Sequence, residues 1–178
     1  QPEKYQDTVE HVIRKGNTPA GMHISIMVKE ILDFLEIKPG QVGFDATLGY
    51  GGHTKAMLQC LQGEGHMYAT DVDPEESAKT RKRLAEQGFG EDMLTVKLQN
   101  FCTIDEIAKE VGGFDFILAD LGVSSMQIDN PKRGFSYKVD GPLDLRLNQE
   151  KGISAAERLD TISVEELAGM LDENSDEP

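Results

Sequence analysis

The sequence has few cysteines, no long apolar run and no recognisable export signal. None of its apolar runs approaches the roughly 20 residues that a helix needs to cross a bilayer. No charged segment followed by an apolar one opens the chain, so we expect a cytoplasmic protein. Cys60 and Cys102 lie far apart, and no second pair is present to form a metal-binding knuckle. Free buried thiols are the expected state in a reducing compartment, and no metal is predicted.

Positive charge is scarce as well. The 178 residues include 18 Lys and Arg against 32 Asp and Glu, a net charge of −14. Nucleic-acid binding draws much of its affinity from cations that neutralise phosphates, so the composition argues against an RNA partner. Such a partner requires positive charge that is concentrated locally, or a basic part outside this chain. The start at Gln1 and the end at Pro178 favour a fragment.

Apolar segments alternate regularly along the chain with residues that end helices and strands. Residues 1–20 are polar and predict a poorly ordered lead-in with a short helix over 8–14. Strand patterns alternate four times with helical patterns, which predicts a parallel sheet with right-handed crossovers, the doubly wound α/β fold class. The predicted strands are 42–45, 66–70, 94–98 and 114–119, and the predicted helices are 27–35 (with Met27, Ile31, Phe34 and Leu35 on its apolar face), 53–61, 73–88 and 104–110.

The pattern changes after residue 120. Two segments, 154–157 and 163–166, begin with Ser and carry Glu three positions later, which predicts capping boxes for two short helices. We find no further strand pattern. The second part of the chain is therefore expected to be helical.

The segment DATLGYGGH, residues 45–53, joins the first predicted strand to its helix. Small residues there let the backbone approach a ligand at a helix amino terminus. Dinucleotide-binding loops have Gly-x-Gly-x-x-Gly, but Thr54 stands where the third Gly should be. An acidic residue with small residues two, four and six positions on, here Thr47, Gly49 and Gly51, is instead the methyltransferase pattern. A tight structural turn is the alternative. We expect a side chain at Gly51 to fill space that a methionine moiety needs.

Polar and aromatic residues follow the next two predicted strands. Asp71 ends the second strand, and its two carboxylate oxygens could accept both hydroxyls of a ribose. Asp73 lies close by, but a helix cap explains it more simply. Phe101 follows the third strand, where it could stack on an adenine, although the pattern alone favours a core position two to one.

The most particular stretch lies between residues 120 and 146. Its segments DLGVSSMQ (120–127), RGFS (133–136) and DGPLDLR (140–146) resemble the RsmH (MraW) family, as does GGH at 51–53. Members of this family are S-adenosylmethionine-dependent methyltransferases that modify the N4 amine of a cytosine in small-subunit ribosomal RNA. The resemblance covers about the first half of a family member. It implies a Rossmann-like, incomplete class I methyltransferase fold and cofactor contacts from Gly51, Gly52, His53, Asp71, Phe101, Asp120 and Gln127.

Asp120 is the predicted catalytic residue. The cytosine amine is a poor nucleophile because its lone pair is delocalised into the ring. A carboxylate that accepts a hydrogen bond from this amine would orient the lone pair toward the cofactor's methyl group, so catalysis would consist mainly of positioning. A role limited to cofactor contact, or to capping the strand end, stays open for Asp120.

Cations and aromatics are interleaved between residues 132 and 146. Such a mixture suits a phosphate backbone and an extruded base, although a solvated loop is nearly as consistent with it. Arg133 and Phe135 are the predicted RNA contacts. The other members of this group are Lys132, Tyr137, Lys138 and Arg146.

These inferences give a domain organisation and a hypothesis for function. Residues 1–21 form the lead-in, 22–147 the cofactor-binding core, and 148–178 the start of a helical substrate-recognition region. The expected activity is N4-cytosine methylation of small-subunit rRNA or of the assembled subunit. Methyl transfer to another acceptor, or a non-catalytic nucleoside-binding module associated with ribosomes, are the alternatives. Self-association is expected, because the fourth strand lacks a neighbour on one side.

Overall fold

The computed structural model describes residues 25–175, which form two compact units divided between Leu121 and Gly122. The helix expected over residues 8–14 lies outside the described residues. In the described part of the chain, no helix is long and apolar enough to cross a membrane. The functional boundary predicted after residue 147 stays a prediction.

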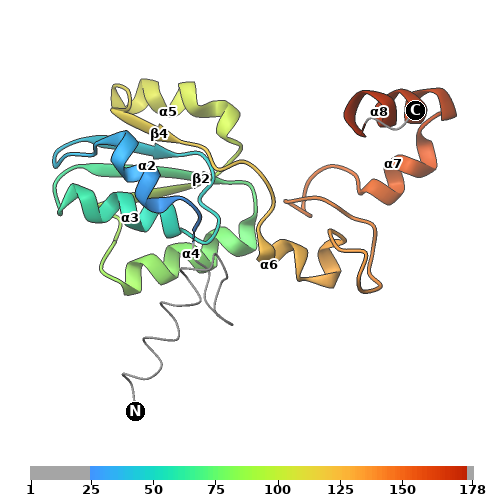
Figure 1. Cartoon of the computed structure of the whole chain (residues 1–178), viewed down its shortest axis with the longest axis horizontal. Helices are drawn as coiled ribbons and strands as arrows, with labels where there is room; N and C mark the ends of the chain where they lie inside the picture. The colour runs from blue at the N-terminus through green and yellow to red at the C-terminus, as the bar shows by residue number, and fades with distance from the viewer. Residues whose placement is uncertain (1–24, 176–178) are drawn as a thin grey trace, which may run out of the picture. The chain divides into compact units, whose positions relative to one another are not determined.

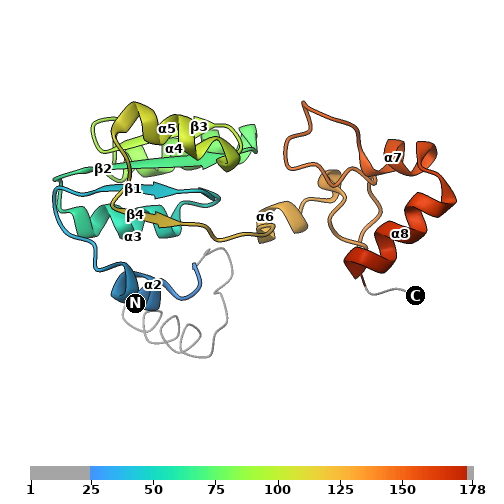
Figure 2. The same cartoon turned by 90° about the horizontal axis from the view of Figure 1, so that it is seen from above.

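The first unit contains a four-stranded parallel sheet with the order β3-β2-β1-β4 (Figures 1 and 2). The predicted doubly wound α/β fold is therefore confirmed. β4 is shorter than predicted, since it pairs with β1 over only three residues. The strands are β1 (Val42–Asp45), β2 (His66–Asp71), β3 (Leu94–Leu98) and β4 (Phe116–Leu118).

Helices cover both faces of this sheet. α3 (Gly52–Leu61) and α4 (Pro74–Glu86) lie on one face, and α5 (Ile104–Val111) lies on the other (Figure 1). Because alternate strand residues point to opposite faces, β2 contributes to two apolar clusters. The larger cluster joins α3 and α4 to the strands, and the smaller joins α5 to Phe44 of β1. Buried members of the larger cluster are Leu48, Met57, Leu58, Leu61, Met67, Ala69, Leu84, Leu94 and Phe116, and those of the smaller are Phe44, Ala46 and Ile107.

The first described helix, α2 (Val28–Leu35), packs with only part of the predicted face. Phe34 is 86% exposed, and Met27 is the N-cap residue with a left-handed backbone rather than part of the helix. Leu35 contacts the larger cluster as predicted, together with Leu32, which the spacing did not single out.

Gly43 of β1 is required by a close approach across the sheet. A Cβ atom at this position would lie 2.2 Å from two ring atoms of Phe116 and 2.5 Å from the sulfur of Met67. Both neighbours are the register partners of Gly43 on β4 and β2. The missing side chain thus lets the Phe116 ring lie over the middle of the sheet.

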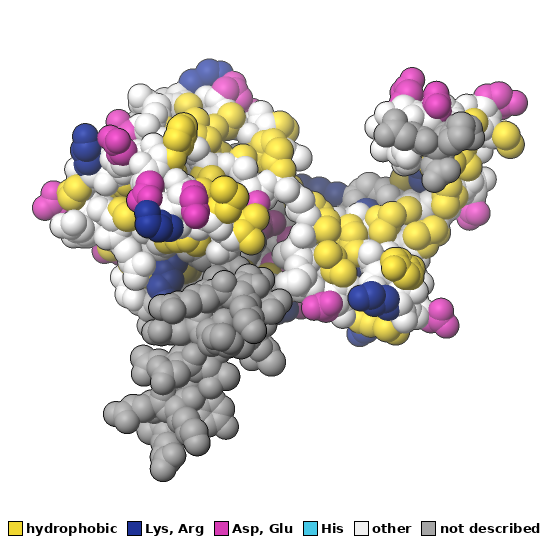
Figure 3. All heavy atoms as spheres, in the orientation of Figure 1, with side chains coloured by type: hydrophobic (Ala, Val, Ile, Leu, Met, Phe, Trp, Pro, Cys, Tyr) yellow, Lys and Arg dark blue, Asp and Glu magenta, His cyan; other side chains and the backbone are white. Residues whose placement is uncertain are grey.

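The second unit consists of short helices joined by long loops. The capping box predicted at Ser154 is present, whereas that at Ser163 is only half formed: Ser163 Oγ accepts the Glu166 N–H, but the Glu166 carboxylate pairs with Arg158. No apolar side chain of this unit is buried among the described residues, and apolar atoms cover much of its surface (Figure 3). Its helical elements are α6 (Ser125–Ile128), η2 (Pro131–Arg133), α7 (Ala155–Thr161) and α8 (Val164–Ser175).

Candidate functional site

The loop that follows β1 is organised around the buried carboxylate of Asp45. Its Oδ1 accepts the Thr47 N–H at 3.0 Å, and its Oδ2 accepts the Thr54 hydroxyl at 2.6 Å. Burial raises the pKa of the Asp45 carboxyl, although these hydrogen bonds act in the opposite direction. Thr47 takes the place of the first small Gly of the methyltransferase pattern. Its Oγ1 also accepts the N–H of Asp120 at 2.8 Å, so one side chain ties the loop after β1 to the end of β4.

Two glycines of this loop differ in what surrounds them. Gly49 and Gly51 both have positive φ angles, +48° and +79°. A Cβ atom at Gly49 would have no neighbour closer than the Thr47 carbonyl oxygen at 3.7 Å, but one at Gly51 would lie 2.7 Å from Thr80 Cγ2. Gly51 therefore makes room for α4, a reason for its small size that the sequence did not predict; the space that it leaves for a methionine moiety stays a prediction. A contact between its backbone and the cofactor stays a prediction.

Asp71, at the carboxyl end of β2, is partly buried and supports the same loop. Its Oδ2 accepts the Gly49 N–H, and its Oδ1 accepts the Asp73 N–H, both at 2.9 Å. Partial burial raises the pKa of the Asp71 carboxyl against the effect of these bonds. Asp73 is the N-cap of α4, as predicted, and accepts the N–H groups of Glu75 and Glu76. Each Asp71 oxygen keeps a lone pair that a hydroxyl could use.

Two residues of α4 that the sequence did not single out hold the loop from the other side. The Thr80 hydroxyl donates to the Gly49 carbonyl at 2.6 Å. Arg83 donates to the Tyr50 carbonyl at 2.7 Å, and its guanidinium lies 3.6 Å from the centre of the Tyr50 ring. Because more than 30 residues separate the partners, no local pattern could have indicated these contacts.

The aromatic residue after β3 is exposed. Phe101 begins the short helix η1 (Phe101–Thr103) and is 41% exposed, so the core position favoured by the pattern is wrong. Asn100 caps this helix by accepting the Cys102 N–H. An exposed ring beyond the carboxyl end of β3 remains available for stacking.

Asp120 follows β4 at the same edge of the sheet. Its side chain is 45% exposed, and its Oδ2 lies 3.6 Å from Nδ1 of His53 at the start of α3. The His53 ring is buried, and its Nε2 lies 2.8 Å from the Ile26 carbonyl oxygen. Asp45 and Asp71 end β1 and β2, and Asp120 follows β4, so the three carboxylates lie at the carboxyl ends of three neighbouring strands.

The predicted site residues of the second unit make contacts that support its own loops. Gln127 is buried and forms a capping box with Ser124 at the start of α6. Arg133 is buried, and its guanidinium donates to the carbonyls of Arg146 and Leu147. Cofactor contact by Gln127 and RNA contact by Arg133 or the half-buried Phe135 therefore stay predictions.

Residues 132–146 expose less positive charge in the structure than the sequence predicted. Arg146 makes a bidentate ion pair with Asp144 and also donates to the Gly152 carbonyl. The hydrogen bond from Arg146 strongly lowers the pKa of the Asp144 carboxyl. With Arg133 buried, Lys132 and Lys138 are the exposed cations of this segment.

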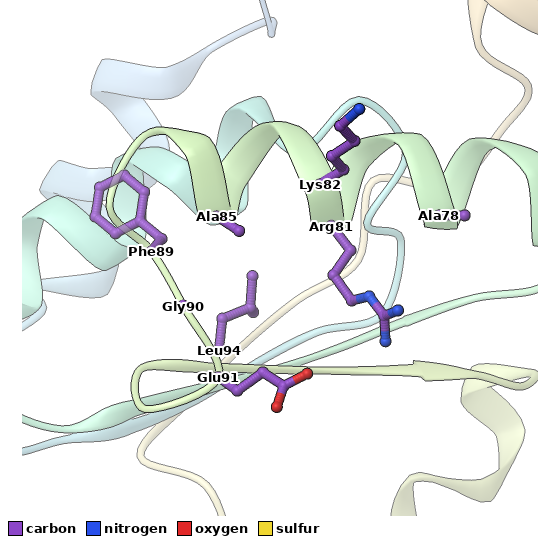
Figure 4. A pocket seen from close by; sticks show the side chains of 8 residues that line it. All are labelled: Ala78, Arg81, Lys82, Ala85, Phe89, Gly90, Glu91 and Leu94. Carbon is purple, nitrogen blue, oxygen red and sulfur yellow. The ribbon is translucent and has the colours of Figure 1, made fainter.

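A shallow pocket lies away from these residues, between α4 and the turn before β3 (Figure 4). Leu94 begins β3, so the pocket adjoins the amino end of that strand rather than its carboxyl end. It contains none of the predicted site residues. The candidate site therefore lies at the strand ends and not in this pocket. Among the described residues, no cluster of His, Cys, Asp or Glu could hold a metal ion.

Acidic residues at the carboxyl ends of parallel strands, around a glycine-containing loop, define a doubly wound α/β domain of the nucleoside-binding type. The chain belongs to the MraW methylase family, whose model matches residues 20–178. It is 85% identical over 177 residues to "Ribosomal RNA small subunit methyltransferase H 1" of Agathobacter rectalis, covering 99% of this chain and 51% of the relative. The protein of that name from Lachnoclostridium phytofermentans is 72% identical over 178 residues, 49% of its length.

The chain therefore spans about half the length of these curated relatives. Among solved structures, it is similar to an rRNA methylase from Streptococcus thermophilus, with a TM-score of 0.40 and 26% identity. That similarity covers 48% of this chain and 50% of the other.

Proposed function

We propose that the protein transfers a methyl group from S-adenosylmethionine to the N4 amine of a cytosine in small-subunit rRNA. The main structural support is that the loop after β1 is held from two sides. Asp71 accepts the Gly49 N–H, and Thr47 accepts the Asp120 N–H. Membership of the MraW methylase family and the names of the relatives support the choice of reaction and substrate.

The residues present fit this cofactor chemically. The open side of Gly49 leaves room for a ligand beside the loop, and the remaining lone pairs of Asp71 suit ribose hydroxyls. The exposed ring of Phe101 suits an adenine. Carboxylates at the same edge favour a ligand that carries positive charge. S-adenosylmethionine would supply a methyl group on a positively charged sulfur.

In this mechanism the chain itself mainly positions the reactants. Asp120, held by Thr47, would accept a hydrogen bond from the cytosine amine, which turns the nitrogen lone pair toward the methyl group. Its carboxylate also stabilises the positive charge that develops on the amine as the bond forms. The net charge of −14 leaves phosphate binding to local cations or to parts of the protein beyond these residues.

The test is to incubate the full-length protein with labelled S-adenosylmethionine and small ribosomal subunits that lack this modification. We expect label on the N4 atom of a cytosine, identified by nucleoside mass spectrometry. Label in protein would identify a different acceptor, and cofactor binding without transfer would indicate a non-catalytic module. Either result would contradict the proposal.

A further inference from the structure

The buried ring of His53 connects the segment before α2 with the end of β4. Its Nε2 lies 2.8 Å from the Ile26 carbonyl oxygen, and its Nδ1 lies 3.6 Å from Asp120 Oδ2. A carbonyl oxygen only accepts hydrogen bonds, so Nε2 must carry the proton. In the neutral ring, Nδ1 therefore presents a lone pair to the Asp120 carboxylate.

Two acceptor atoms that face each other in this way lack a proton between them. Adding one proton would convert the arrangement into a charge-assisted hydrogen bond, which is stronger than a neutral one. His53 is 8% exposed and Asp120 45%, so a substrate reaches the pair from the Asp120 side. The pair is arranged to take up one proton from that side.

We propose that His53 acts through Asp120 to accept the proton that the substrate amine must lose. This inference rests on the proposed function. The amine lone pair forms the N–C bond while the S–C bond breaks with its electrons on sulfur, and the amine nitrogen becomes positively charged. One N–H proton then passes to Asp120 and is shared with His53 Nδ1, which leaves a neutral methylated amine and a protonated pair. Solvent later removes that proton.

Besides Asp120, other charged groups belong to the elements around His53. The buried Asp45 is close enough that a charge on His53 would lower the pKa of its carboxyl. Asp71, on β2, is engaged by the Gly49 and Asp73 N–H groups, and the charged residues of α2 (Lys29, Glu30 and Asp33) are exposed.

The test measures single-turnover methyl transfer by the full-length protein between pH 5 and 8, the range in which histidine titrates. His53→Gln keeps a donor for the Ile26 carbonyl but has no basic Nδ1. We expect the wild-type rate to rise with pH and the variant to lose this rise and to slow by roughly 100-fold, the low end of general-base effects.

The matched control is His66→Gln. His66 also lies beside a carbonyl, that of Asp92, but at the amino end of β2. This variant should keep the wild-type pH profile. Persistence of the rise in His53→Gln would overturn the inference while leaving the proposed function intact, whereas a wild-type protein that transfers no methyl group would overturn both.

Nitrogen NMR of histidine-labelled protein gives a readout that does not depend on activity or on His53→Gln folding. We expect His53 Nδ1 to resonate as an unprotonated nitrogen at high pH and as a protonated one at low pH, with Nε2 protonated throughout. A proton on Nδ1 with a bare Nε2 at high pH would overturn the inference. In Asp120→Asn the amide can donate to Nδ1, and we expect the pH rise of the transfer rate to be lost there too.

Discussion

At the scale of single residues, the site depends on how neighbouring carboxylates divide their roles. Asp71 and Asp73 lie two positions apart, yet one supports the loop after β1 and the other caps α4. Asp73 is almost fully buried beneath its two N–H donors, whereas Asp71 keeps an exposed part. Only Asp71 can therefore meet a ligand at the carboxyl edge.

Because Asp71 and Asp73 have different roles, we expect their substitution to reduce different quantities. Asp71→Ala should weaken S-adenosylmethionine binding by about 1–3 kcal/mol, because hydroxyl and N–H partners lose their acceptor. Asp73→Ala should lower the free energy of unfolding by about 1 kcal/mol with little change in affinity. Calorimetry and urea unfolding of both variants measure the two effects. A greater loss of affinity in Asp73→Ala would mean that the ribose carboxylate has been misassigned.

The two loop glycines form a second matched pair. Gly51→Val should lower the free energy of unfolding by the left-handed backbone strain of about 1–2 kcal/mol and by about 1–3 kcal/mol more, since its side chain would meet Thr80 and distort the α4 packing. Gly49→Val has open space, so it should cost only the left-handed backbone strain of about 1–2 kcal/mol. Its side chain would instead occupy the ligand side of the loop and reduce cofactor affinity. Equal free energies of unfolding for the two variants would contradict the assignment of Gly51 to the α4 side of the loop and of Gly49 to the ligand side.

At the scale of elements, β1 and β4 fit together through a small residue on one strand and a large ring on the other. β1 has no side chain at Gly43, and this absence lets the Phe116 ring of β4 lie across the strand. The pairing of β1 with β4 extends over only three residues, and the contact of the Phe116 ring adds to it. The loop that positions Asp120 depends on the same strand.

Gly43→Ala should therefore destabilise the sheet by about 1–3 kcal/mol, the usual cost of inserting a methyl group into a filled core. Phe116→Leu in the same chain should recover part of the loss, because the smaller side chain gives back the space. Urea unfolding of the single and double variants measures this coupling. Strictly additive losses would show that the two positions do not compete for the same volume.

At the scale of the whole molecule, the sheet ends in an unprotected strand. In the described part of the chain β4 pairs with β1 alone, and Ile117 on it is 51% exposed. The opposite edge strand, β3, carries Lys97, a charge of the kind that discourages edge-to-edge pairing. The apolar surface of the second unit adds to the exposed area.

We therefore expect the 178-residue chain, purified alone, to self-associate, to bind cofactor poorly and not to methylate RNA. Ile117→Lys should shift its sedimentation toward the monomer by placing a charge on the β4 edge. Leu98→Lys on β3, where the native side chain is 50% exposed, is the matched control and should change little. A monodisperse and active wild-type chain would contradict this prediction.

Local patterns in the sequence predicted the four strands and most of the helices, and they indicated where a site could lie, which stays a prediction. The strands, the Asp73 cap, the glycine loop and the acidic residue after β4 all follow from residues within a few positions of one another. Spacing and capping act over one or two turns, so they leave a signal in the sequence. The resemblance of residues 120–146 indicated the family, and the match over residues 20–178 confirmed it.

Only the tertiary structure decided what each side chain meets. Phe34 satisfies the helical spacing but is exposed, and Arg133 lies in a basic segment but is buried against carbonyls. Gly51 makes room for Thr80, and Thr47 reaches Asp120 across 73 positions of sequence. These contacts join segments brought together by the packing of the whole sheet, whose free energy is spread over many residues and leaves no signature at any one of them.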